Sequence, residues 1–180
     1  MLENRFPSDE PVQHERPATS DEVGLVRRAQ MGSATAFERL VVERGPELYR
    51  YLAIRLRNES DARDALQETL AAAWQALPTL REPARFWPWL VAIAAHKAAD
   101  IARVRTPAAE RAEILDRADD DALEIREALD RLSPRFREVL LLRYGLRLSE
   151  QEVADMLGVR VGTVKSRAAR ARNALEELLR

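Results

Sequence analysis

The chain of 180 residues is long enough for one large domain or two small ones, and 46% hydrophobic with 33% charged residues is typical of globular helical proteins. It has no cysteine and two isolated histidines, His14 and His96, which excludes disulfides and thiolate chemistry and argues against a zinc site. The net charge of −1 conceals segments of opposite sign: residues 160–172 carry five cations and no acid, whereas residues 110–127 carry eight acids and three arginines.

The polar N-terminus contains Pro7, Pro11 and Pro17, so we expect residues 1–20 to form a disordered tail. This segment lacks the apolar core of a signal peptide, and no apolar run in the chain approaches the ~18 residues of a membrane span. We therefore expect no membrane insertion and a cytoplasmic location.

Helical periodicity runs through residues 21–104, which we expect to form a first domain. Gly45-Pro46 is expected to break or kink its second helix, because proline removes a backbone donor. Ser60 is expected to cap a helix over residues 61–77, and another helix is expected from Phe86 to about Arg103.

The expected helix over residues 61–77 has an acidic face opposite its apolar stripe. Asp61, Asp64 and Glu68 share that face, and Gln67 lies beside them. Such a face can dock a basic partner helix through charge-assisted hydrogen bonds, although on an isolated helix a solvated acidic surface is the commoner explanation.

Aromatic and cationic side chains are combined in the segment FWPWLVAIAAHKAADIARVR, residues 86–105. Planar rings that stack on bases, beside cations that hold phosphates, are what single-stranded DNA binding requires. Trp89 and Leu90 are expected to pack inward. The candidates for DNA contact are Phe86, Trp87, Lys97, Arg103 and Arg105.

Residues 105–121 lack a strong apolar stripe, so we expect a flexible acidic linker there and a second domain over residues 122–180. In that domain Ser149 and Glu152 have the S-x-x-E spacing of a helix-starting capping box, and Gly158 marks the end of the same helix. A second helix follows at once, which indicates a helix-turn-helix.

The last helix separates apolar from basic residues. Val164, Ala168, Ala171 and Leu175 recur at the spacing of a buried face. A helix that enters the DNA major groove needs a buried apolar face of this kind and, opposite it, an exposed face of short polar and basic side chains. The plainer alternative is a basic face that is only solvated. The candidates for duplex contact are Thr163, Lys165, Ser166, Arg167, Ala169 and Arg170.

The segment LSEQEVADMLGVRVGTVKSRAARARNALEELL, with LDRLSPRFREVLLLRY before it, resembles region 4 of the sigma-70 family of bacterial transcription initiation factors. The closest likeness is to the small two-domain members, the extracytoplasmic-function (ECF) sigma factors. Response regulators of the LuxR type share part of this pattern, so the N-terminal half has to decide between the two.

That half is similar to sigma region 2. The pattern D-x-x-Q-E followed by A-W resembles region 2.2, and the likeness implies that Asp61, Asp64, Gln67 and Glu68 contact the clamp helices of the β′ subunit of RNA polymerase. The segment that begins at Phe86 resembles regions 2.3 and 2.4, which open the −10 promoter element, and the loop Thr79–Arg85 stands where such factors shape a base pocket. Ala95-His96 replaces the usual Arg-Asn, which implies unusual −10 preferences or weaker melting.

Together these patterns predict an all-α, non-enzymatic sigma factor without cofactor or metal. Its expected partners are core RNA polymerase, promoter DNA read at −35 and melted at −10, and an anti-sigma factor. The alternative is a stand-alone helix-turn-helix repressor or activator, in which residues 21–104 sense a ligand or dimerise; such a protein binds its operator without polymerase. An enzyme is disfavoured because the sequence has no glycine-rich phosphate loop and no nucleophile beside a base.

Overall fold

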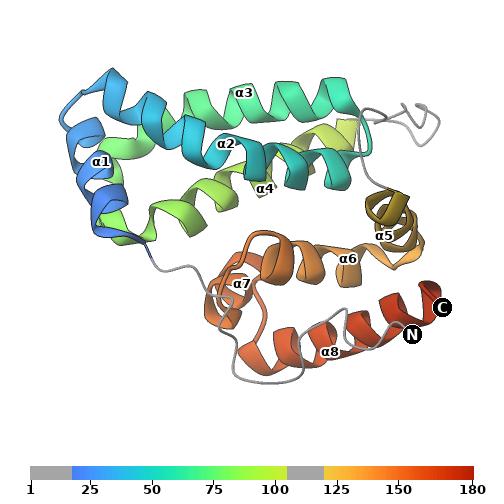
Figure 1. The fold of residues 1–180 in the computed structure, drawn as a ribbon. Coiled ribbons are helices and arrows are strands. Elements are labelled where there is room, and N and C mark those ends of the chain that lie inside the picture. Colours follow the sequence, from blue (N-terminus) through green and yellow to red (C-terminus); the bar gives the residue numbers. More distant parts are fainter. Residues whose placement is uncertain (1–17, 105–119) are drawn as a thin grey trace.

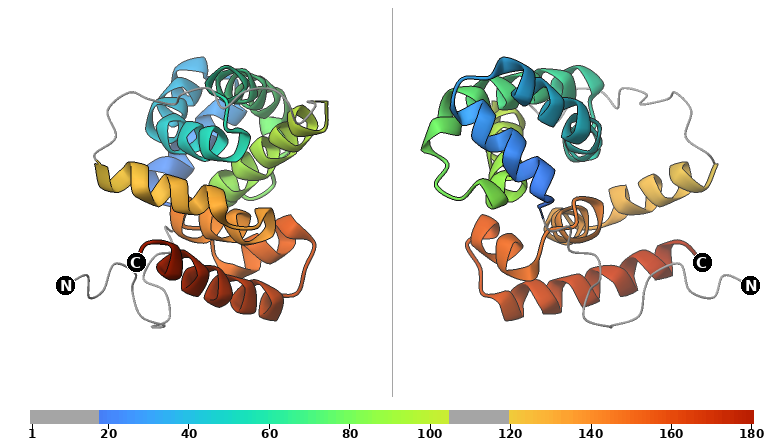
Figure 2. Two further views of the ribbon diagram at one scale, coloured as in Figure 1. Left: turned by 90° about the vertical axis from the view of Figure 1, so that its right-hand side faces the viewer. Right: turned by 60° about the vertical axis from the view of Figure 1, so that its left-hand side comes forward.

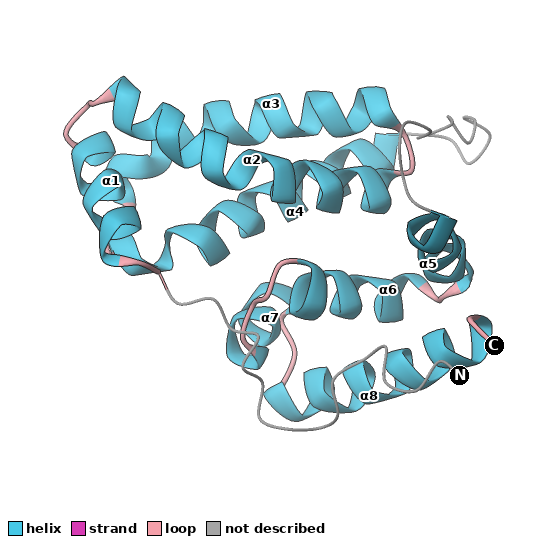
Figure 3. Cartoon of the chain, in the orientation of Figure 1, coloured by secondary structure: helices cyan, strands magenta, loops and turns pink. Residues whose placement is uncertain are grey.

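The computed structural model describes residues 18–104 and 120–180, and all regular structure in these ranges is helical (Figures 1 and 3). The expected all-helical fold with two helical domains is thereby confirmed. Residues 1–17 of the expected tail and 105–119 of the expected linker lie outside the described residues, whereas Ser20 already belongs to the first helix and Asp120 and Asp121 to the first helix of the second domain.

The N-terminal domain is a bundle in which α2, α3 and α4 lie along one another and α1 covers one end (Figure 1). Short 3₁₀ turns, η1 (Leu77–Thr79) and η2 (Pro83–Arg85), connect α3 to α4. The helices are α1 (Ser20–Gln30), α2 (Ala34–Leu56), α3 (Glu59–Ala76) and α4 (Phe86–Val104).

The C-terminal domain packs α6 and α7 on α8, with α5 against the far part of α8. Figure 2 shows that α6 and α7 lie between the N-terminal bundle and α8, which is outermost. The helices are α5 (Asp120–Arg131), α6 (Pro134–Leu140), the π-helical turn η3 (Leu141–Gly145), α7 (Glu150–Leu157) and α8 (Val161–Leu178).

Gly45-Pro46 does not break the helix, because α2 runs through both residues from Ala34 to Leu56; the other form of this expectation, a kink, stays a prediction. Proline removes one backbone hydrogen bond, a cost of about 3 kcal/mol in a helix interior. Leu40, Leu48 and Leu52 on either side are fully buried in the core, and their packing holds the helix together across that gap.

The cap expected at Ser60 is also misplaced, since α3 begins at Glu59 and Asn58 is its N-cap residue. Asn58 Oδ1 accepts a hydrogen bond from the backbone N–H of Asp61 at 2.9 Å. Asparagine, like serine, offers the short side-chain acceptor that a helix start requires, so the sequence pattern alone could not choose between the two.

We expect Asn58→Ala to lower the free energy of unfolding by about 1 kcal/mol, because it removes that capping bond. The matched substitution Ser60→Ala should change it by less than about 0.5 kcal/mol. Denaturant unfolding of both variants measures the difference, and an equal loss in the two would contradict the observed helix start.

A buried ion pair joins α1 to α2, and its arginine also contacts α4. Arg44 of α2 donates from Nε to Glu22 Oε1 of α1 at 2.7 Å, and both residues are almost fully buried. The same guanidinium lies 4.8 Å from the ring centroid of Trp87 on α4. Because an unpaired charge is costly at this depth, the pair fixes α1 and α2 at the position that supports the Trp87 ring.

The helix-turn-helix forms as the local pattern indicates. Ser149 and Glu152 make the reciprocal hydrogen bonds of a capping box, and Gly158 ends α7 in the left-handed conformation with φ of 63°. The four apolar residues expected on the inner face of α8 are all buried. The turn and this packed face together determine how α8 presents its opposite side to solvent.

Candidate polymerase and nucleic-acid interfaces

The outward surface of α8 holds the residues predicted to contact duplex DNA. Lys165, Ser166 and Arg170 are exposed, and Thr163, Arg167 and Ala169 are partly buried. Lys165 Nζ lies 3.4 Å from Glu150 Oε2 of α7, and Arg170 donates to the backbone oxygen of Ser166 at 3.2 Å. These are weak surface contacts that a phosphate could replace.

The acidic face of α3 is open to solvent. Asp64, Gln67 and Glu68 are exposed, whereas Asp61 in the first turn is partly buried. Glu68 Oε2 lies 3.1 Å from Lys97 Nζ on the neighbouring α4. The predicted polymerase-contact residues are therefore collected on one helix, and one of them is paired with a residue predicted to contact the −10 element.

The residues predicted to contact the −10 element do not share one exposed face. Phe86 and Trp87 are only 1% and 4% exposed, so neither ring is accessible for base stacking in this arrangement. Lys97 pairs with Glu68, and Arg103 Nη2 lies 2.5 Å from Asp100 Oδ1 on its own helix. Arg105 lies outside the described residues.

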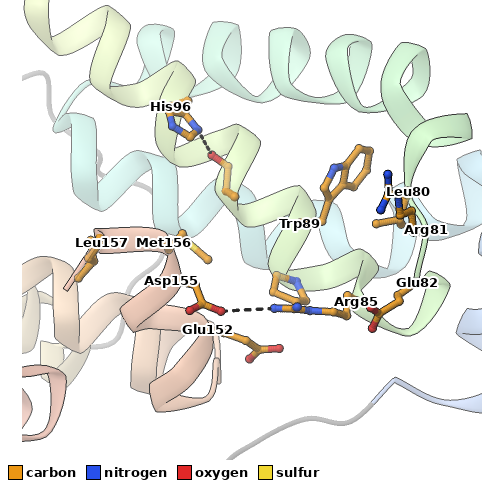
Figure 4. Close-up of a pocket in the computed structure, with 13 residues that line it drawn as sticks. Leu80, Arg81, Glu82, Arg85, Trp89, His96, Glu152, Asp155, Met156 and Leu157 are labelled. Carbon is orange, nitrogen blue, oxygen red and sulfur yellow. Dashed lines mark hydrogen bonds and ion pairs between the residues drawn. The ribbon is translucent and has the colours of Figure 1, made fainter. Parts of the chain in front are cut away.

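A pocket of about 700 Å³ lies where the η1–η2 loop and α4 face α7 (Figure 4). Trp89, expected to pack inward, does pack against the core beside buried Phe86, and because it is only partly buried it also lines this pocket. Arg85 Nη2 lies 3.7 Å from Asp155 Oδ2 across it, as Figure 4 shows. Residues of both domains form the walls, among them Leu80, Arg85, Trp89, Ala92, Met156 and Leu157.

Sequence reasoning missed the polar residues that join the two domains. Glu138 of α6 accepts a 2.9 Å hydrogen bond from the Tyr51 hydroxyl and pairs with Arg55, both on α2. Arg57 Nε lies 2.8 Å from Asp130 Oδ1 of α5. No local pattern could have marked these residues, because each pair joins positions more than 70 residues apart in the chain.

Burial at this junction shifts two pKa values. It raises the pKa of the Tyr51 hydroxyl well above its ordinary value, and the adjacent Glu138 carboxylate raises it further. Burial, with the nearby Arg57 charge, lowers the pKa of the Arg137 guanidinium. Arg137 donates to the backbone oxygens of Leu129 and Leu132, and so connects the end of α5 to α6.

Within residues 18–104 and 120–180 there is no group of three or more His, Asp or Glu side chains that could hold a metal ion. In the same ranges no helix is long and apolar enough to cross a membrane.

The chain matches two protein-family models: Sigma-70 region 2 over residues 40–107, and Sigma-70, region 4 over residues 122–175. The ECF RNA polymerase sigma factor SigC of Mycobacterium tuberculosis is 34% identical over 171 residues, which cover 88% of this chain and 92% of SigC.

Two solved structures have the same fold. CnrH in complex with the cytosolic domain of CnrY aligns with a TM-score of 0.72 and 30% identity, over 88% of this chain and 97% of CnrH. The sigma factor RpoE in complex with the anti-sigma factor NepR, from Bartonella quintana, aligns with a TM-score of 0.66 and 26% identity, over 79% of this chain and 96% of RpoE. The two matched regions show that the chain belongs to the sigma-70 family, and the identity with SigC over nearly its full length places it in the ECF subgroup, whose non-enzymatic members direct RNA polymerase to promoters.

Proposed function

We propose that this sigma factor uses three separate binding surfaces. In this proposal α3 binds polymerase, α8 binds the −35 element, and the η1–η2 loop with α4 binds the −10 element. The observation that carries the proposal is the separation of charge. An exposed acidic face on α3 and an exposed basic face on α8 are held on different domains of one chain. One face suits a basic protein partner and the other suits phosphate.

For the −35 element, α8 enters the major groove as the recognition helix. Lys165 and Arg170 reach phosphates or guanine edges, Thr163 and Ser166 offer short polar contacts, and Ala169 allows close approach. The support is that these residues surround the exposed side of a helix whose opposite side is buried in the domain core.

For polymerase, Asp64, Gln67 and Glu68 contact the clamp helices of the β′ subunit. The support is that all three side chains are exposed on one helix. A carboxylate and an amide spaced by three residues can accept and donate hydrogen bonds to one partner helix.

For the −10 element, the loop from Thr79 to Arg85 and the adjoining turn of α4 capture an unstacked base. The support is the wall that this loop and α4 contribute to the pocket, which includes the Trp89 ring and the cation of Arg85; α7 forms the opposite wall. Base stacking on an aromatic ring beside a phosphate-binding cation is the usual way to hold a single strand.

CnrH and RpoE were solved with CnrY and the anti-sigma factor NepR respectively. By analogy we infer that an anti-sigma factor also binds this chain, and that the chain works in the cytoplasm, where its polymerase and promoters are.

A library of promoters randomised around −35 and −10 tests whether the chain reads both DNA elements together with polymerase. With core polymerase and this chain, the sequenced transcripts should be enriched in two short motifs at a fixed spacing. Enrichment of a single operator that the chain binds equally well without polymerase would instead favour the repressor alternative.

A further inference from the structure

Arg147 lies in the loop that leads into the helix-turn-helix, and its backbone is left-handed, with φ of 55°. Glycine adopts this conformation freely, whereas the Cβ of any other residue crowds the backbone there, so Arg147 is strained. The other described non-glycine residue with a positive φ is Arg57, whose side chain pairs with Asp130. Strain of this kind persists only where the surrounding structure imposes it, and it is concentrated at functional positions.

The neighbours of Arg147 explain its unusual backbone. Leu146 and Leu148, on either side, are each 1% exposed, so both side chains are held in the core. Their backbone N–H groups donate to the oxygens of Leu141 and Leu142, at 2.8 and 3.1 Å respectively. Because both neighbours are fixed in this way, the residue between them projects outward.

The side chain of Arg147 is exposed. Within residues 18–104 and 120–180, no side chain or backbone oxygen forms an ion pair or a hydrogen bond with its guanidinium. The arginine therefore gives the fold no contact that compensates for the strain. An unpaired guanidinium that projects into solvent is well suited to bind an anion such as phosphate.

The start of α7 brings this cation to the side of the domain that presents α8. Glu150, three residues after Arg147, has its Oε2 atom 3.4 Å from Lys165 Nζ on the exposed face of α8. In a helix-turn-helix the second helix enters the major groove, while the first crosses the phosphate backbone. The nearby acids are engaged elsewhere, Glu150 by Lys165 and Glu152 by the Ser149 N–H at 2.8 Å, so neither neutralises Arg147.

We propose that Arg147 binds a phosphate of the DNA backbone beside the −35 element, outside the base pairs that α8 reads. The proposal rests on the role of α8 as recognition helix. Arg147 contributes affinity and fixes the position of the domain on the duplex, but it does not select bases, because phosphate contacts carry no sequence information. The arginine lowers stability at a position that suits glycine, and the phosphate contact is what it adds.

Three substitutions separate the phosphate contact from the strain. Arg147→Gly removes both, Arg147→Ala removes only the cation, and Arg147→Lys keeps a cation. We expect the glycine and alanine variants to bind a −35 duplex about tenfold more weakly, with the slope of log affinity against log salt reduced by about 1. Arg147→Lys should keep the slope. Only the glycine variant should melt at a higher temperature, by about 2–4 °C.

Arg57→Gly is the matched control. It also removes an arginine with a positive φ, but from the end of α2 in the N-terminal domain. Its duplex affinity and salt slope should equal those of the unmodified chain, and helical circular dichroism verifies that each variant is folded. A glycine variant at position 147 that melts higher but binds the duplex as tightly as the unmodified chain would overturn the proposal.

The contacted phosphate is located with duplexes that carry one uncharged methylphosphonate at a time, across the −35 element and its flanks. The unmodified chain should lose affinity when the contacted phosphate is neutralised, and the Arg147→Ala variant should be insensitive at that position. Equal sensitivity of the two proteins at every position would contradict a contact between Arg147 and phosphate.

Failure of this proposal is distinguishable from failure of the −35 assignment. If Lys165→Ala combined with Arg170→Ala weakens duplex binding while the Arg147 variants bind normally, α8 is the recognition helix and Arg147 makes no contact. If that double variant also binds normally, the assignment of α8 fails as well.

Discussion

Asp64→Ala combined with Gln67→Ala is expected to weaken binding to core polymerase by about 30-fold or more, the effect of losing an interface hot spot of ~2 kcal/mol. Both side chains are exposed on α3, where they can make charge-assisted and amide hydrogen bonds to a partner helix. Removing them leaves the buried side of α3, including Ala65, Thr69 and Ala73, unchanged.

Titration of fluorescently labelled protein with core polymerase measures this loss. Glu43→Ala on α2 removes an exposed acid from the same domain but away from the acidic face of α3, so its affinity should match that of the unmodified chain. Equal affinity of the double variant and this control would remove the polymerase-docking role from α3.

Lys165→Ala combined with Arg170→Ala is expected to reduce affinity for a −35 duplex by about 100-fold, since each base or phosphate contact contributes ~1–3 kcal/mol. If both contact phosphates, the slope of log affinity against log salt should fall by about 2. Loss of the Lys165–Glu150 contact costs little stability, because it is an exposed ion pair.

Electrophoretic mobility shift or fluorescence anisotropy with the duplex, measured over a range of salt concentrations, gives both the affinity and its salt dependence. Arg131→Ala removes an exposed cation from α5 and serves as the charge control. The double variant should still bind core polymerase normally. Unchanged duplex affinity and slope would show that α8 is a solvated basic helix and not the recognition helix.

The parts of the fold that could be predicted from sequence are those specified by neighbouring residues. The capping box of Ser149 and Glu152, the left-handed Gly158 and the apolar spacing of α8 lie within one short segment, and the structure has all three. The break expected at Pro46 fails for the opposite reason: the propensity is local, but the packing that overrides it comes from other helices.

The candidate sites, too, have a part that the local sequence predicts and a part that depends on contacts between distant residues. Periodicity alone locates the exposed faces of α3 and α8, since a helix with one buried side must expose the other. It could not reveal that Trp87 is buried or that its N–H binds the Leu146 oxygen, 59 residues away in the chain. An aromatic cluster has the same sequence signature whether its rings stack on bases or pack in a core.

We propose that one chain carries both a carboxylate-bearing surface for polymerase and a basic helix for DNA. Mixing the purified chain with core polymerase that lacks a sigma factor, followed by size-exclusion chromatography with light scattering, tests it most directly. We expect a stable one-to-one complex, which then retains a promoter fragment that core polymerase alone does not. A chain that elutes separately from core polymerase at every protein concentration would contradict it.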